Sequence, residues 1–166
     1  MMTVSAIKAL VDGGDAGAAK STARLSTDFL NRYNEALMLI ELAVDDHGIV
    51  EDLKAWRSIT YREHFETSPL RCAPSALAAY EDVSPARRAG FEALCVAMTR
   101  LVATATALLS DKPAGLDAAT IAEVAGEALR RQIGRATQFI NANGAVDIGM
   151  VESRALQAEV DAMLTR

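Results

Sequence analysis

Aromatic side chains and cysteine are scarce in this 166-residue chain. Only 5% of its residues are aromatic, and its two cysteines are Cys72 and Cys95. Because aromatic and β-branched residues are the natural strand formers, their scarcity disfavours a β-sheet. The two cysteines are too far apart to form a CxxC motif, so we expect small buried thiols in a reducing compartment.

Long uncharged runs are also missing. Residues 101–110 form an uncharged run of ten, whereas a membrane-spanning helix needs about 20 apolar residues. The first residues lack a basic segment followed by an apolar run, so we expect no signal peptide. A modest net charge of −5 argues against a basic, nucleic-acid-binding face. We therefore expect a cytoplasmic protein that binds neither membranes nor nucleic acids.

Catalytic and metal-binding signatures are missing as well. The chain has no glycine-rich phosphate loop, no nucleophile elbow and no zinc-ligand spacing. Its histidines are His47 and His64, and no Glu-x-x-His motif of the kind used by di-iron bundles includes either of them. These absences favour a protein that is not an enzyme and that uses no metal or cofactor, although helical enzymes leave fewer sequence signatures.

Alanine, in contrast, is abundant, at 32 positions. Because alanine is the best helix former, it predicts helix throughout the chain. Arginine outnumbers lysine by 13 to 4, a bias that together with the alanine content indicates a GC-rich bacterial genome. We expect an N-terminal arm over residues 1–21, mobile or docked, and a single domain over residues 22–166. The predicted domain is all-α: a compact antiparallel bundle of four to five main helices with short connecting helices.

Capping and stop residues give the expected helix boundaries. Ser84 before Pro85 is a strong start signal, and Thr60 with Glu63 matches a capping box. The expected main helices cover residues 27–46, 85–110, 118–143 and 147–164, and the short ones cover 49–57 and 60–67.

The core is expected on faces with apolar residues at spacings of three and four. Residues 36–40 are apolar on every face of the helix, which predicts that the helix over 27–46 is central and buried. The predicted core residues are Leu37, Ile40, Leu94, Met98, Leu101, Leu129 and Ile133.

Four polar residues are the candidate ligand-binding site. Asn34 and Glu41 are seven residues apart, so they share one face of an otherwise apolar helix, where a buried carboxylate needs partners. Tyr61 and His64 share a face of the next predicted helical region. Together the four predict a polar pocket for a small ligand or a reaction. The alternative is that Asn34 and Glu41 are solvated and that His64 belongs to an aromatic cluster.

His64 also raises a third option, histidine phosphotransfer. An exposed histidine on a helical bundle can accept a phosphoryl group, and such domains carry lysine and glycine three and four residues later. Those positions hold Thr67 and Ser68 here, which disfavours this role.

A candidate anion site lies at the start of the helix over residues 85–110. Arg87 and Arg88 in the first turn oppose the helix dipole by about 0.3–1 kcal/mol each. An anion held by Ser84, the free N–H groups and these arginines would explain them. The alternative is that both arginines pair with nearby acidic side chains.

Taken together, these features favour a non-catalytic helical module that works by protein–protein contact, as a small bacterial regulatory or adaptor protein. The alternative is a bundle that binds a small ligand, or catalyses a reaction, at the polar pocket. The last helix, over residues 147–164, is amphipathic and short, so it must dock to be stable. We expect it to form a homodimer about a two-fold axis, unless it completes the bundle of its own chain.

Overall fold

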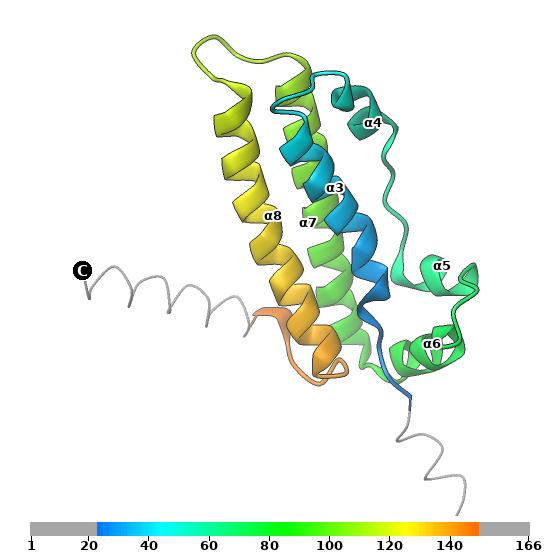
Figure 1. The fold of residues 1–166 in the computed structure, drawn as a ribbon. Helices are drawn as coiled ribbons and strands as arrows, with labels where there is room; N and C mark the ends of the chain where they lie inside the picture. The colour runs from blue at the N-terminus through cyan, green and yellow to red at the C-terminus, as the bar shows by residue number, and fades with distance from the viewer. Residues whose placement is uncertain (1–22, 150–166) are drawn as a thin grey trace, which may run out of the picture.

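The computed structural model describes residues 23–149 of the chain (Figure 1). Helices make up 72% of these residues, with no strand among them, which confirms the predicted all-α bundle. The predicted N-terminal arm, and the predicted last helix beyond residue 149, lie outside the described residues.

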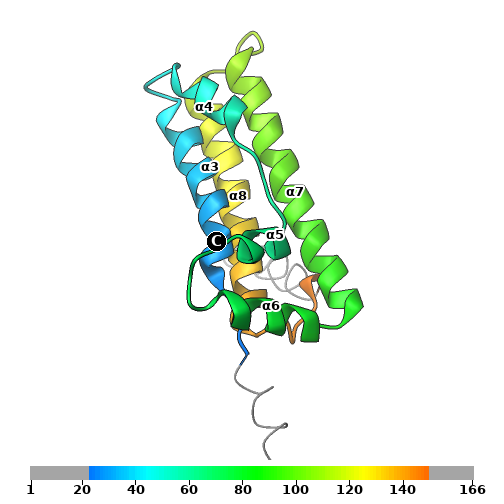
Figure 2. The ribbon, with the colours of Figure 1, turned by 90° about the vertical axis from the view of Figure 1, so that its right-hand side faces the viewer.

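Six α-helices follow one short 3-10 helix in the described part of the chain. They are η1 (Thr27–Leu30), α3 (Asn31–Leu42), α4 (Ile49–Ala55), α5 (Tyr61–Glu66), α6 (Ala73–Asp82), α7 (Pro85–Ser110) and α8 (Ala118–Asn141). The three long helices run side by side, and α8 packs against both α3 and α7 (Figure 1). The short helices α4, α5 and α6 lie on one side of this bundle. Figure 2 shows how the extended segment 56–60 crosses between α3 and α7 to connect α4 with α5.

Local capping residues define most helix ends. The Ser84 side chain accepts a hydrogen bond from the backbone N–H of Arg87, and Asp117 caps α8 in the same way. As predicted, α7 covers residues 85–110. After α8, the chain turns through a left-handed Gly144 with φ of 71°. A Cβ there would lie 2.5 Å from a methyl group of Val83, so this close turn requires glycine.

The core lies between the three long helices and under the short ones. Four of the predicted core residues are buried: Ile40, Leu94, Met98 and Leu129. The other three pack against this core but are only partly buried: Leu37, Leu101 and Ile133. By length and composition α7 would also suit a membrane span, a test that the core helix of a soluble protein passes too.

The expectation of a central helix over residues 27–46 is wrong. Helix α3 buries Tyr33, Ala36 and Ile40 on one face, but Met38 and Leu42 on the other face are 51% and 48% exposed. The reason is that α3 packs against α7 and α8 through its one buried face, and no long helix among the described residues covers the face that carries Met38 and Leu42.

Candidate functional site

The four candidate ligand-binding residues do not converge on one pocket. Asn34 and Glu41 lie on the exposed side of α3, and Glu41 forms an ion pair with Arg130 of α8. Tyr61 is only 3% exposed and lines a cavity that none of the other three reaches. The structure therefore does not bring these four residues together in one pocket. A helix at the edge of a bundle can contain several consecutive apolar residues and still expose its polar side chains to water.

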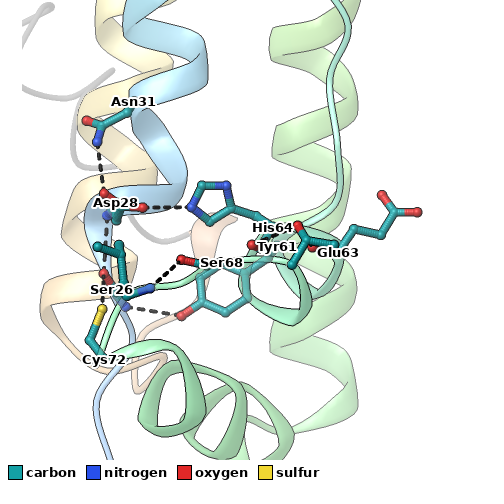
Figure 3. Close-up of polar contacts among 10 residues, drawn as sticks. Ser26, Asp28, Asn31, Tyr61, Glu63, His64, Ser68 and Cys72 are labelled. Carbon is teal, nitrogen blue, oxygen red and sulfur yellow. Dashed lines mark hydrogen bonds and ion pairs between the residues drawn. The ribbon is translucent and has the colours of Figure 1, made fainter.

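His64 is paired with a carboxylate that the sequence did not point to. Its Nε2 lies 2.8 Å from Oδ2 of Asp28 in η1 (Figure 3), and Nδ2 of Asn31 donates a hydrogen bond of 3.0 Å to the other oxygen of Asp28. The imidazole also meets the rings of Phe29 and Phe65 edge-on, with centroids 5.9 and 4.7 Å away. His64 thus joins η1 to α5 within an aromatic cluster.

Tyr61, which is buried, also connects the region around η1 to α5. Its hydroxyl accepts a hydrogen bond from the Ser26 N–H at 3.1 Å (Figure 3) and donates one to the Ala76 carbonyl oxygen at 3.3 Å. Burial raises the pKa of this phenol to about 12. The ring stacks on Tyr80 with a centroid distance of 4.6 Å. Tyr61 therefore holds the chain before η1, α5 and α6 together.

The candidate anion site at the start of α7 has its charges paired with carboxylates. Nε of Arg87 lies 3.1 Å from Oδ1 of Asp147, and a guanidinium nitrogen of Arg88 lies 3.3 Å from Oε2 of Glu81. Ser84 accepts a hydrogen bond from the Arg87 N–H at 3.4 Å. This geometry matches the alternative to an anion site given by the sequence, in which both arginines pair with nearby acidic side chains.

A cavity of about 390 Å³ lies between segment 56–60, helices α5 and α6, and one face of α7. The sequence did not identify it. It is lined by Tyr33, Ser58, Ile59, Thr60, Tyr61, Glu63, Tyr80, Phe91, Glu92, Cys95, Val96, Thr99 and Arg100. The tyrosine and phenylalanine rings are buried, whereas Glu92, Val96 and Arg100 are exposed. The cavity therefore has an aromatic base and a rim that reaches solvent.

Segment 56–60 is held at both ends, which keeps the cavity formed. Nε1 of Trp56 donates a hydrogen bond of 3.1 Å to the carbonyl oxygen of Arg32 in α3. In return, the Arg32 guanidinium donates one of 2.9 Å to the carbonyl oxygen of Arg57. At the other end, Thr60 and Glu63 form the predicted capping box. The extended backbone between these two anchors forms part of the cavity wall.

Two hydrogen-bonded pairs provide polar groups at the cavity. The Tyr80 hydroxyl donates a hydrogen bond of 2.7 Å to Oε1 of Glu92. The Tyr33 hydroxyl lies 3.1 Å from Oγ1 of Thr99 and donates to the Cys95 carbonyl oxygen at 3.1 Å. Both pairs connect α7 with a neighbouring helix, so their polar atoms are fixed in direction.

Burial favours the neutral form of the phenols and the thiol at the cavity. Burial raises the pKa of Tyr33 to about 12, and burial followed by the hydrogen bond to Glu92 raises the pKa of Tyr80. Burial also raises the pKa of the Cys95 thiol to about 12. Because the thiolate is the reactive form of cysteine, this thiol is a poor nucleophile. Among the described residues, no group of three or more potential ligands is arranged to hold a metal ion.

Two further hollows adjoin this cavity along α7. One of about 450 Å³ shares Ser58 and Thr99 with it, and one of about 320 Å³ shares Glu63 and Glu92. The sequence signal for this face is the series Glu92, Val96 and Arg100 at spacings of four, which places three exposed side chains on one stripe of α7.

Comparisons of the chain with protein-family models, with curated proteins and with solved structures found no match.

Proposed function

We propose that this protein is a helical bundle that binds a small organic molecule in the cavity between segment 56–60 and α7. The observation that supports this most strongly is the cavity itself. Its volume of about 390 Å³ falls within the roughly 300–1,000 Å³ typical of ligand pockets. Five separate parts of the fold contribute to its wall, namely α3, segment 56–60, α5, α6 and α7, so its shape depends on how these elements pack together.

The composition of the wall supports binding of an amphipathic ligand. Apolar groups such as Ile59, Phe91 and Val96 line the cavity together with the fixed polar groups of Tyr80 and Thr99. Ligand pockets commonly combine a mostly apolar wall with a few placed hydrogen-bonding groups. The high pKa of the phenols and the thiol supports binding, because none of these groups is activated for acid–base or nucleophilic chemistry at neutral pH.

A fragment screen by thermal shift tests this proposal. A ligand that binds only the folded state raises its unfolding temperature. The decisive variant is Val96→Trp, which adds an indole at the exposed rim of the cavity. Val124→Trp is the matched control, since Val124 is a 65% exposed valine on α8 that does not line the cavity.

We expect fragments that stabilise the wild type and Val124→Trp but fail to stabilise Val96→Trp. Circular dichroism of both variants checks that the fold is retained. A screen whose hits stabilise Val96→Trp as well as the wild type would place binding elsewhere and contradict the proposal. A screen that yields no stabilising fragment would contradict it too.

Protein–protein contact is the second candidate function, supported by one observation on the exposed face of α3. Met38 and Leu42, four residues apart on α3, are about half exposed, an arrangement that suits packing against another helix. We propose that α3 contributes to a homodimer. Sedimentation velocity of the wild type should give twice the 17.7 kDa mass of the chain, and Leu42→Glu should reduce it to a monomer. A wild-type monomer at high concentration would contradict this candidate.

A further inference from the structure

We infer that the ligand of this cavity is an organic amine, with an apolar body and a protonated amino group held near Glu92 and Glu63. This inference rests on the proposed function, because it names the chemical class of the molecule that the cavity binds. It depends on the charges at the two ends of the cavity and on the aromatic ring of Tyr80, which lies beside the carboxylates at one end.

The carboxylates of Glu63 and Glu92 line a small hollow at one end of the cavity, and neither forms an ion pair with a cation among the described residues. Arg62 lines the same hollow, but its guanidinium pairs with Glu81. Glu63 accepts a hydrogen bond from the Thr60 N–H, and Glu92 accepts one from the Tyr80 hydroxyl. Each of these contacts uses one oxygen of a carboxylate that can accept several hydrogen bonds. Glu81, just outside the cavity, differs because it pairs with both Arg62 and Arg88.

The aromatic ring beside these carboxylates already attracts cations. The guanidinium carbons of Arg62 and Arg88 lie 5.8 and 6.0 Å from the centre of the Tyr80 ring. Such distances are typical of cation–π contacts. Because these two guanidinium groups already lie near the ring, a protonated amine would be held mainly by the negative charge of Glu92, which strengthens each N–H···O contact.

The opposite end of the cavity carries the positive charge of Arg100. Arg100 lies two helical turns after Glu92 on α7, about 12 Å along the helix axis. This separation gives the cavity a negative end and a positive end, joined by apolar groups such as Ile59 and Val96. An amine with an apolar body matches the negative end and the middle, whereas a carboxylate placed near Glu92 would be repelled.

The test uses three probes of similar size: 2-phenylethylamine, 2-phenylethanol and 3-phenylpropanoate. They share an aromatic body and differ in charge. Isothermal titration calorimetry measures their affinities for the full chain. We expect the amine to bind most tightly and the carboxylate most weakly.

Charge-removing variants identify the end at which the amine binds. Glu92→Gln keeps an acceptor for the Tyr80 hydroxyl, and we expect it to raise the Kd of the amine roughly tenfold, since charge-assisted hydrogen bonds are about twice as strong as neutral ones. Glu63→Gln should also raise the Kd of the amine, because it removes a negative charge. Glutamine also serves in a capping box, so the cap is kept. Arg100→Gln should lower the Kd of the amine, because it removes a positive charge from the other end of the cavity. Glu123→Gln, an exposed position on α8, is the control for net charge.

The outcomes separate this inference from the proposed function. Equal or tighter binding of the alcohol, lost in Val96→Trp, would overturn the amine inference and leave ligand binding in the cavity standing. Loss of amine affinity in Glu123→Gln to the same extent as in Glu92→Gln would also overturn it, because a general charge effect would then explain the preference. If the amine does not bind, the inference fails, and the fragment screen with Val96→Trp decides the proposed function separately.

Discussion

The hydroxyl of Tyr80 lies 2.7 Å from Oε1 of Glu92 and connects α6 to α7 at the end of the cavity. The same phenol stacks on Tyr61, so one residue both supports the buried aromatic cluster and directs a carboxylate towards the cavity. This hydrogen bond thus fixes Glu92 at the end of the cavity where we place the amino group of the ligand.

The alkaline titration of tyrosine tests the packing of this cluster. The chain has three tyrosines, and burial raises the pKa of Tyr33 and Tyr61 to about 12 and also raises that of Tyr80. A phenol whose pKa is higher in the folded state stabilises that state below the unfolded pKa of about 10. This contribution is lost as the pH rises from about 10 through 12.

Ultraviolet absorbance of tyrosinate against pH measures this effect. Near pH 11 the folded protein should remain almost free of tyrosinate, whereas the chain in concentrated guanidinium should titrate near pH 10. At still higher pH, ionisation and unfolding should occur together. A midpoint near pH 10 in the folded protein would mean that the three rings are solvated.

The capping box at the rim of the cavity should stabilise the fold measurably. Thr60 caps α5 and fixes the end of segment 56–60, so Thr60→Ala should lower the free energy of unfolding by about 1 kcal/mol. Thr104→Ala is the matched control, at an exposed position inside α7, and should change it by less than about 0.5 kcal/mol. Urea denaturation gives both values. Equal effects at the two positions would contradict the capping assignment.

The pair formed by His64 and Asp28 should contribute a small coupling energy. Both side chains are partly exposed, at 19% and 32%, so solvent screening limits their interaction to about 0.5–1 kcal/mol. A double-mutant cycle with His64→Gln and Asp28→Asn, measured by urea denaturation, isolates this term. Zero coupling would contradict the contact. A stable phosphoryl label on the wild type that His64→Gln abolishes would support the phosphotransfer option instead.

We expect two leucines of the predicted core to contribute differently to the free energy of unfolding. Leu129 is fully buried in α8, so Leu129→Ala should cost about 2–5 kcal/mol. Leu101 is only partly buried on α7, and Leu101→Ala should cost clearly less, because some of its surface is already in water. Thermal or urea unfolding compares them directly. Equal losses would show that α7 is rotated relative to the described packing.

Helix ends could be predicted from the sequence because their causes are local. Ser84 and the proline after it start α7, and Thr60 reaches Glu63 only three residues away. The orientation of each helix depends on contacts between distant segments. Residues 36–40 suggested a central helix, but α3 packs against α7 and α8 through one face only, and Met38 on the other face is exposed.

The candidate site was mostly beyond prediction for the same reason. Tyr33 meets Thr99 across 66 residues, and His64 meets Asp28 across 36. Neither pair shares a helix or a turn, so no spacing in the sequence brings the partners together. Of the four predicted pocket residues, Tyr61 is the one that lines the cavity.

Amide chemical-shift mapping with 2-phenylethylamine tests the central claim most directly. Ligand binding in the cavity predicts shifts concentrated in residues 58–61 and 92–100, and predicts that Val96→Trp abolishes them while Val124→Trp retains them. Shifts concentrated on the exposed face of α3, or shifts that persist unchanged in Val96→Trp, would contradict the claim that this cavity is the binding site.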